Sequence, residues 1–425
     1  MTDYRQMWAD LGMDLEKHDL LLGALPAIYE NIYMSQENRP GGMGYFDFVI
    51  SEIHGLRVKE LMDHKAKGGK VVGTYCVFVP EDVILAAGGV PVGLCAGTQF
   101  SVPDAEAILP SQTCALIKSS FGFKVGKTCP YTQASDLIVG ETTCDGKKKM
   151  YELLADYHPT YVMEVPQSKT SSAHALFYDE VVKFKDKMES VAGVTITPES
   201  LAAATSLVEK KKKALQRFNA ARKAAPSPIS GLDALLVNQV SFYDDVVRFT
   251  DQVNSLTDEL ESRIKQGTAV SPADAPRIVV AGSPMAIPNW KVHRILEDSG
   301  AVAVAEESCV GFRYYNYLTG RNDGSLEGQL HAVTNRLLEN HCACFTPNEE
   351  RVQDILDLAK DYSAGGVVYY NLSFCQTYAS EAIKVGRALE AAGIPMLNIE
   401  TDYSDGDMAQ IKTRVDAFLE MVRGN

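Results

Sequence analysis

Apolar and polar residues follow two different periods along this chain, and the change of period divides it into segments. Apolar residues recur at helical spacing over 15–33 and 46–62, on either side of a loop at 38–42, so residues 1–69 are expected to form a helical segment. From Lys70 onward, short apolar runs alternate with amphipathic stretches. This alternation is typical of buried parallel strands connected by helices.

The strands are expected in two groups. Residues 70–170 should form a first α/β lobe with strands at 71–79, 90–94, 136–143 and 161–165, and helices at 81–87 and 147–157. Residues 171–270 are nearly all helical in pattern, with Thr197 as a helix N-cap and one break at 226–231. Residues 271–425 should form a second lobe with strands at 277–281, 301–306, 366–374 and 396–401.

The predicted fold class is therefore α/β, with two doubly wound parallel-sheet lobes of Rossmann or flavodoxin type. An N-terminal helical segment precedes the lobes and a second helical segment separates them. In such folds ligands bind where the carboxyl ends of the strands open outward. A functional site is expected in the cleft between the lobes.

Composition and charge exclude several classes of protein. The formal net charge of -14 would repel a phosphate backbone, so nucleic acid is not an expected partner. No apolar run reaches the ~18 residues that a membrane span needs, and the N-terminus lacks the apolar core of a signal peptide. We therefore expect a globular cytoplasmic protein that does not insert into a membrane.

Nine cysteines are the main chemical feature of the sequence. In the cytoplasm they would stay reduced, so a disulfide framework is not expected. Cys144, Cys309 and Cys375 follow predicted strands directly, at the carboxyl ends where sites form. Cys76 and Cys95 are flanked by apolar residues of predicted strands and are interpreted as small buried apolar side chains.

The remaining thiols lie in loops. Cys114 and Cys129 precede Cys144 at equal steps of fifteen residues, and Cys342 and Cys344 come shortly before a predicted helix. No CxxC spacing is present, so neither a zinc finger nor a ferredoxin motif is predicted. Thiolates suit soft metals and iron-sulfur clusters, and a dispersed set of six could hold two four-iron cubanes with three ligands each.

Acid-base candidates lie close to these thiols in the sequence. Glu306 and Glu307 precede Cys309, and His341 adjoins Cys342, so these three are the candidate catalytic residues for proton delivery. His158 is a further candidate. The alternative for the carboxylates is a solvated pair, and for the histidines a hydrogen-bonded structural role.

Several segments together resemble one family, the 2-hydroxyacyl-CoA dehydratase and benzoyl-CoA reductase subunits, and within it the double-cubane cluster proteins. The segments are 79–88 (VPEDVILAAG), 136–145 (DLIVGETTCD), 229–231 (ISG), 366–375 (GVVYYNLSFC) and 393–402 (GIPMLNIETD). The likeness extends from about Lys70 to the C-terminus.

The resemblance implies the ligands of the clusters. A subunit of this family holds one cubane through three cysteines, at positions that match Cys114, Cys144 and Cys375. The further thiols Cys129 and Cys309, with one of the 342/344 pair, point to the branch in which a sulfide bridges two cubanes. Cys344 is preferred to Cys342 because it lies nearer the predicted helix start, where backbone amides favour a thiolate.

The resemblance also implies partners and activity. A separate homodimeric activator, itself an iron-sulfur protein, would hydrolyse ATP and supply electrons at low potential, and this chain indeed has no GxxxxGK[ST] loop of its own. The chain would form a homodimer and reduce small molecules such as acetylene, azide or hydrazine in an anaerobic setting. The alternatives are a 2-hydroxyacyl-CoA dehydratase subunit with a single cubane and an electron carrier without a substrate of its own.

Overall fold

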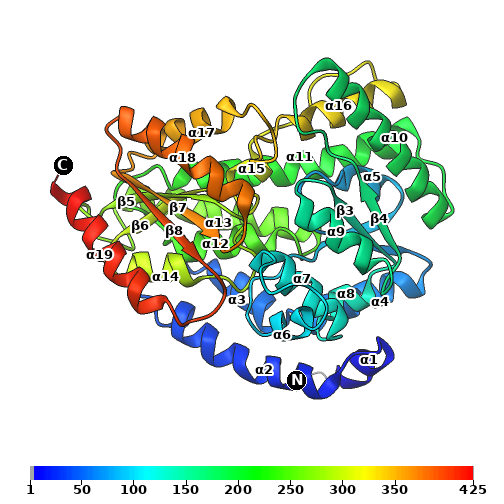
Figure 1. The fold of residues 1–425 in the computed structure, drawn as a ribbon, viewed down its shortest axis with the longest axis horizontal. Helices are drawn as coiled ribbons and strands as arrows, with labels where there is room; N and C mark the ends of the chain where they lie inside the picture. The colour runs from blue at the N-terminus through cyan, green and yellow to red at the C-terminus, as the bar shows by residue number, and fades with distance from the viewer. Residues whose placement is uncertain (1–3, 425) are drawn as a thin grey trace.

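Two separate parallel sheets organise the chain in the computed structural model, which describes residues 4–424 (Figure 1). Each sheet has four strands, and every pair of neighbouring strands is parallel. The first sheet has the order β2 (Gly89–Gly93), β1 (Lys70–Thr74), β3 (Leu137–Glu141) and β4 (Thr160–Met163). The second has the order β6 (Val302–Glu307), β5 (Arg277–Gly282), β7 (Gly366–Leu372) and β8 (Met396–Thr401). The predicted fold class is confirmed.

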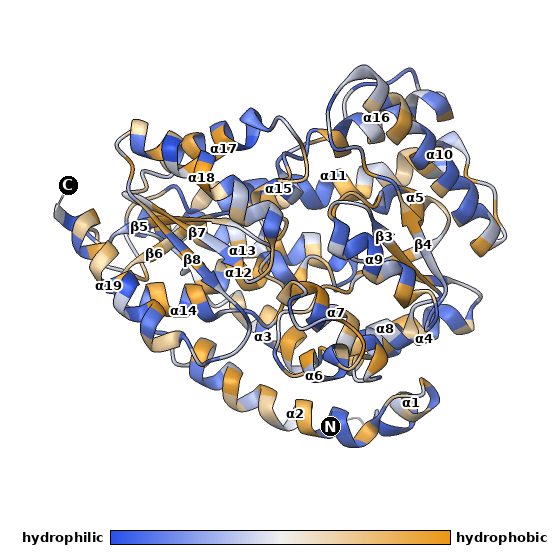
Figure 2. Cartoon of the chain, in the orientation of Figure 1, coloured by the Kyte–Doolittle hydropathy of each residue, from blue (hydrophilic) through white to orange (hydrophobic). Residues whose placement is uncertain are grey.

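The central strands are apolar because helices cover both of their faces. All five residues of β3 and all seven of β7 are buried. Nearly continuous apolar runs of this kind distinguish parallel sheets from the alternating pattern of half-exposed ones. Figure 2 shows the strands of the second sheet as largely hydrophobic ribbons behind more polar helices.

Both sheets have a topological switch point between their two central strands. In the first, the chain passes from β1 to β2 on one side and then returns to β3 on the other side of β1; the second repeats this with β5, β6 and β7. Loops leave such a switch point in opposite directions and open a crevice at the carboxyl ends of the strands. The geometry therefore predicts a site after β1 and β3, and another after β5 and β7.

Helices surround each sheet. Those that follow the strands of the first lobe are α5 (Glu81–Ala86), α6 (Val102–Glu106), α7 (Ala115–Val125), α8 (Pro130–Ala134) and α9 (Asp145–Leu154). Those of the second are α14 (Lys291–Asp298), α15 (Phe312–Tyr315), α16 (Leu326–Leu338), α17 (Glu349–Asp361), α18 (Gln376–Ala391) and α19 (Met408–Gly424). Figure 1 shows α16 beside α10, at the far side of the first lobe. Helix α16 thus belongs to the second lobe in sequence but packs on the first lobe.

Four helices join the lobes: α10 (Ser171–Ala192), α11 (Pro198–Ala221), α12 (Gly231–Val240) and α13 (Val246–Gln266). Thr197 caps α11 through a reciprocal capping box, and Ser230 caps α12 after the break at 226–231, as predicted. Apolar residues of α11, α12 and α13 share one buried cluster with β5 and β7. These helices thus belong to the core of the second lobe as well as bridging to the first.

The N-terminal segment is helical, as predicted. It comprises α1 (Arg5–Asp10), α2 (Leu15–Tyr29), a π-helical turn η1 (Glu30–Met34), α3 (Met43–Ser51) and α4 (Leu56–Ala66). Figure 1 shows α1 and α2 along one edge of the molecule. Within residues 4–424, no helix combines the length and the apolar character needed to cross a membrane.

Several strands end earlier than predicted, and two of these differences affect the place of a cysteine. β1 ends at Thr74 and β2 at Gly93, so Cys76 and Cys95 lie two residues past the strands and not inside them. The apolar run of 71–79 continues beyond β1 because the following loop is itself buried, with Phe78 only 1% exposed. Periodicity cannot separate such a loop from a strand.

Candidate functional site between the lobes

In the part of the chain that the structure describes, four helices have a cysteine as their N-cap, and three of these cysteines act on one another. Cys114 is the N-cap of α7, Cys144 of α9 and Cys375 of α18. The free N–H groups and the dipole at a helix N-terminus stabilise negative charge there, including that of a thiolate. The backbone amides of Leu116 and Ile117 favour the thiolate of Cys114 in this way. The sequence therefore places three potential thiolates where the backbone supports them.

These three thiols, called here the first thiol group, act on one another although they are far apart in sequence. A side-chain hydrogen bond between Cys114 and Cys375 is the largest cause of a lowered pKa at Cys114 and a raised pKa at Cys375. Burial raises the pKa of Cys144, and the Cys375 thiolate adds to that effect. Two of these thiols come from the first lobe and one from the second, so the group spans the cleft.

A second thiol group contains Cys76, Cys309, Cys342 and Cys344. Burial is the largest cause of the raised pKa values of Cys76 and Cys309, and the negative charges of Cys309 and Cys342 raise the pKa of Cys76 further. Cys342 and Cys344 share a side-chain hydrogen bond, which is the largest cause that lowers the pKa of Cys342 to about 5. Cys76 belongs to the first lobe, and the other three cysteines belong to the second lobe. This group therefore also spans the cleft.

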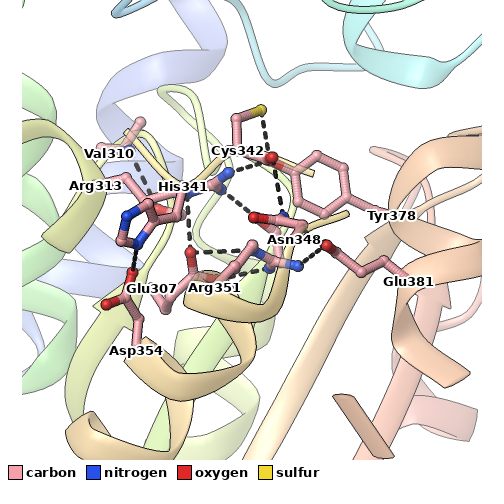
Figure 3. A network of polar contacts seen from close by, with 12 residues as sticks. Glu307, Val310, Arg313, His341, Cys342, Asn348, Arg351, Asp354, Tyr378 and Glu381 are labelled. Carbon is pink, nitrogen blue, oxygen red and sulfur yellow. Dashed lines mark hydrogen bonds and ion pairs between the residues drawn. The ribbon is translucent and has the colours of Figure 1, made fainter. Parts of the chain in front are cut away.

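A cationic network supports the second group (Figure 3). Arg313 is 1% exposed and lies 3.0 Å from Glu307 through Nε, and its Nη2 donates to the carbonyl of Gly282 at 2.7 Å. Its charge favours the thiolates of Cys309 and Cys342. Arg351 binds the other oxygen of Glu307 at 2.6 Å and also pairs with Glu381.

A cavity of about 140 Å³ lies beside the second group. Its wall includes Cys76, Cys95 and Cys309 together with Tyr75, Lys147 and Tyr314. The hydroxyl of Tyr75 is buried without a hydrogen-bond partner. Lys147 forms a close ion pair with the buried Glu141, whose other oxygen accepts from Tyr151 at 3.0 Å. The cavity is thus mainly apolar, with a fixed ammonium at one side.

Cys129 and Cys95 are assigned to neither group, although Cys95 lines the same cavity as Cys76 and Cys309. Cys129 caps the short helix α8. Burial raises the pKa of its thiol, and a side-chain hydrogen bond with Thr132 opposes that effect. It lines a small apolar cavity with Leu21 and His54. Cys95 donates from Sγ to the carbonyl of Tyr75 at 3.0 Å. Of the six cysteines expected as ligands, the structure gathers Cys114, Cys144 and Cys375 in one place and Cys309 and Cys344 in another, but brings Cys129 to neither.

The three acid-base candidates are not gathered either. Glu306 and Glu307 are fully buried and point to opposite sides of β6, one to Arg222 and the other to Arg313 and Arg351. His341 is 9% exposed and its Nδ1 contacts Asp354 at 2.6 Å and Tyr317 at 2.9 Å. His158 lies at the far end of the first sheet, where burial lowers its pKa to about 4. None of the four lines the cavity.

Sequence reasoning missed Cys76, Lys147, Arg313 and Tyr378. Cys76 repeats the spacing of Cys309, two residues after a parallel strand, and correct strand ends would have revealed it. The other three are charged or aromatic residues on helices, and no local pattern distinguishes them from ordinary helix positions. Their importance comes from tertiary contacts alone.

The donor set fits an iron-sulfur cluster better than a single ion. Among residues 4–424, no three histidine, cysteine or acidic side chains converge closely enough to hold one metal ion. Cluster ligands bind separate iron atoms and are spaced more widely, and thiolates are the ligands that such clusters prefer. Beside the first group, the hydroxyl of Tyr403 is buried without a partner and close enough to Cys114 and Cys375 to be affected by their charge.

Comparison with known proteins identifies the family to which the chain belongs. The family model for the 2-hydroxyglutaryl-CoA dehydratase D-component matches residues 76–422. The protein YjiM of Escherichia coli (strain K12) is 35% identical over 365 residues, covering 85% of this chain and 94% of the relative. The (R)-phenyllactyl-CoA dehydratase beta subunit of Clostridium sporogenes is 24% identical, with 85% and 94% covered. One of the subunits of benzoyl-CoA reductase from Thauera aromatica is 20% identical, with 83% and 91% covered.

The predicted resemblance is thereby confirmed at the level of the family. Nearly all of both α/β lobes falls within the matched residues, including every cysteine of both thiol groups. The chain belongs to the 2-hydroxyglutaryl-CoA dehydratase D-component family, which includes dehydratase beta subunits and a benzoyl-CoA reductase subunit.

Proposed function

We propose that this chain is an iron-sulfur reductase component that carries two four-iron cubanes between its lobes. It receives low-potential electrons from a separate ATP-hydrolysing iron-sulfur activator and reduces small molecules. The observation that carries the proposal is the presence of two thiol groups, each assembled from both lobes, where a single-cubane protein needs one. When bound, such a cluster supplies low-potential electron transfer and an iron position open to a substrate.

The first cubane is assigned to Cys114, Cys144 and Cys375. The second is assigned to Cys76, Cys309 and Cys342. Cys76 replaces Cys129 because it shares the second group with Cys309, whereas Cys129 lies beside α8. Cys342 replaces Cys344 because its thiolate is stabilised by the Cys344 thiol and by Arg313. Two sets of three ligands suit two cubanes joined by a bridging sulfide.

The size of the cavity supports small substrates. At about 140 Å³ it is close to the roughly 150 Å³ of cavities that hold benzene. A coenzyme A thioester is several times larger. The cavity would therefore admit molecules such as acetylene, azide or hydrazine beside the second cubane.

Protons for the reduction would come from residues on the cavity wall. Glu81 accepts from Tyr314 through Oε1 at 2.6 Å and pairs with Lys211 through Oε2 at 2.6 Å, and all three line the cavity. Burial would raise the pKa of Glu81, but Lys211 and Tyr314 outweigh it and lower that pKa. The carboxylate thus holds a lysine ammonium and a tyrosine hydroxyl, both with exchangeable protons, at the edge of the cavity.

The iron content of anaerobically purified protein tests the assignment. We expect about eight irons per chain in the wild type and about four in Cys76→Ser or Cys309→Ser, because each substitution removes a ligand of the second cubane only. Cys129→Ser and Cys95→Ser are matched controls and should retain the full iron. A wild type with about four irons, unchanged by Cys76→Ser, would contradict two cubanes.

A single-cubane dehydratase subunit is the second candidate function, and the beta-subunit dehydratases among the relatives favour it. Turnover separates the two. Protein supplied with reductant, activator and ATP should reduce acetylene or hydrazine under our proposal. Dehydration of a 2-hydroxyacyl-CoA with no small-molecule product would support the dehydratase, and electron consumption with no product would support a carrier.

A further inference from the structure

Tyr378 is the polar side chain through which the buried network of Figure 3 reaches a cysteine sulfur. Its hydroxyl lies 3.8 Å from Cys342 Sγ, and both residues are buried, at 7% exposure each. Tyr378 is on the first turn of α18, which Cys375 caps. One helix therefore carries a ligand of the first cubane at its cap and contacts a ligand of the second through its third residue.

The direction of the hydroxyl proton follows from its second partner. Arg313 Nη1 makes a close hydrogen bond to the Tyr378 hydroxyl, and a guanidinium can only donate. The tyrosine oxygen is thus an acceptor toward Arg313. As a cluster ligand Cys342 has no proton to donate, so the contact at the sulfur is an O–H···S bond in which Tyr378 donates and the sulfur accepts.

The network fixes this geometry. Arg313 is held by Glu307 at 3.0 Å and by the Gly282 carbonyl at 2.7 Å. The Tyr378 carbonyl accepts from the hydroxyl of Tyr369 at 3.1 Å, and Tyr369 in turn accepts from Arg351 at 3.1 Å. The hydroxyl of Tyr378 therefore cannot turn away from Cys342 without leaving Nη1 of Arg313 without its hydrogen bond in a buried site.

Hydrogen bonds to the sulfurs are one of the factors that set the reduction potential of an iron-sulfur cluster. A donor withdraws electron density from the ligand sulfur and so favours the reduced, more negative state. We propose that Tyr378, oriented by Arg313, is a positioning residue that raises the reduction potential of the second cubane through its bond to Cys342. This inference rests on the proposed function, because it needs Cys342 as a ligand.

The test is a redox titration of Tyr378→Phe, followed by electron paramagnetic resonance of the loaded protein. We expect a lower potential, with the ratio of reduced to oxidised second cubane falling about tenfold at a fixed potential, equivalent to about 59 mV for one electron. The first cubane should titrate as in the wild type.

Tyr369→Phe is the matched control. It deletes a hydroxyl from the same network, 3.1 Å from the Tyr378 carbonyl, that makes no contact with sulfur. Its potential should equal that of the wild type. An equal shift in both variants would overturn the inference, because it would trace the effect to the network as a whole.

A variant that changes the strength of the bond without removing it covers the case in which Tyr378→Phe does not fold. A 3-fluorotyrosine at position 378 is nearly isosteric, and its more acidic hydroxyl is a stronger donor, so the potential should rise. An unchanged potential in an iron-replete 378 variant would overturn the inference and leave the proposed function intact. Absence of iron from the wild type would instead overturn the proposed function.

Discussion

The buried carboxylate of Glu306 on β6 links the second sheet to the end of α11 through an ion pair with Arg222. Its two oxygens accept from both Nη atoms of Arg222 at 2.6 Å, and His293 approaches at 3.2 Å. Burial would raise the pKa of Glu306, but the Arg222 charge outweighs it and lowers the pKa to about 2. The residue is therefore ionised and structural in this geometry, a role that the sequence alone did not reveal.

Breaking this pair should be costly. Glu306→Gln leaves the Arg222 guanidinium charged and buried, and we expect the free energy of unfolding to fall by about 3–5 kcal/mol. Urea denaturation measures it. Glu261→Gln is the control, since Glu261 makes a similar two-point pair with Arg217 at the surface and should cost less than about 1 kcal/mol. Equal losses in the two variants would contradict the burial argument.

Residue-level prediction succeeded where chemistry and local pattern agreed. Cys144, Cys309 and Cys375 follow strands whose apolar runs are plain in the sequence, so their place near the carboxyl ends of the strands could be expected. Cys129 shares the even spacing of Cys114 and Cys144, but α8 turns it toward the N-terminal helices. Cys76 was hidden because a buried loop extends the apolar pattern of its strand. Spacing along the chain does not determine direction in space.

At the scale of elements, a histidine pair fastens α2 to the turn between α3 and α4. His18 Nε2 and His54 Nδ1 are 2.9 Å apart, and Trp8 packs edge-on against His18. Burial lowers the pKa of His18 to about 4 and that of His54 to about 3. Both rings are therefore neutral when docked, since only one proton fits between the two facing nitrogens.

This pair predicts a pH dependence for the N-terminal helices. Undocked histidines bind protons below about pH 6.5, whereas docked His18 stays neutral until about pH 4. Docking therefore weakens as the pH falls from about 6.5 to about 4. Hydrogen exchange in α1 and α2 should be faster at pH 5 than at pH 7.5, once the intrinsic effect of pH on exchange is corrected for. His18→Gln should flatten this difference, while His331→Gln, an exposed position on α16, should preserve it. Equal exchange at both pH values would contradict the prediction.

Elements were predicted more accurately than their ends. All eight strands, and the capped start of α11 at Thr197, follow from apolar runs and capping residues. The excursion of α16 onto the first lobe was not expected. A buried ion pair between Asp82 of α5 and Arg336 of α16, at 2.6 Å, holds it there, and charged residues of this kind look like solvated helix positions in a sequence.

At the scale of the molecule, the proposed clusters cross-link two lobes that have cores of their own. Most of the buried apolar residues around the first sheet belong to clusters separate from those around the second. Each thiol group, in contrast, takes members from both sides of the cleft. Metal removal should therefore loosen the junction and leave the sheets intact.

Anaerobic chelation tests this expectation. Compared with the iron-loaded protein, hydrogen exchange should rise in the first turns of α7, α9 and α18, while the buried strands β3 and β7 stay protected. The melting temperature should fall because a ligand bound only by the folded state no longer contributes. Unchanged exchange at the three helix starts would contradict a cluster held by their cap residues.

The division of each thiol group between lobes also has a consequence for biosynthesis. Cys76, Cys114 and Cys144 emerge early from the ribosome, but Cys309, Cys342 and Cys375 belong to the second lobe, and β7, which precedes Cys375, gains its neighbour β8 only later in synthesis. Neither set of three can close while the chain is still being translated through that region. If the chain holds the proposed clusters, loading with iron and sulfide is thus a late step in maturation, and the early thiols remain reduced until the later ones have been made.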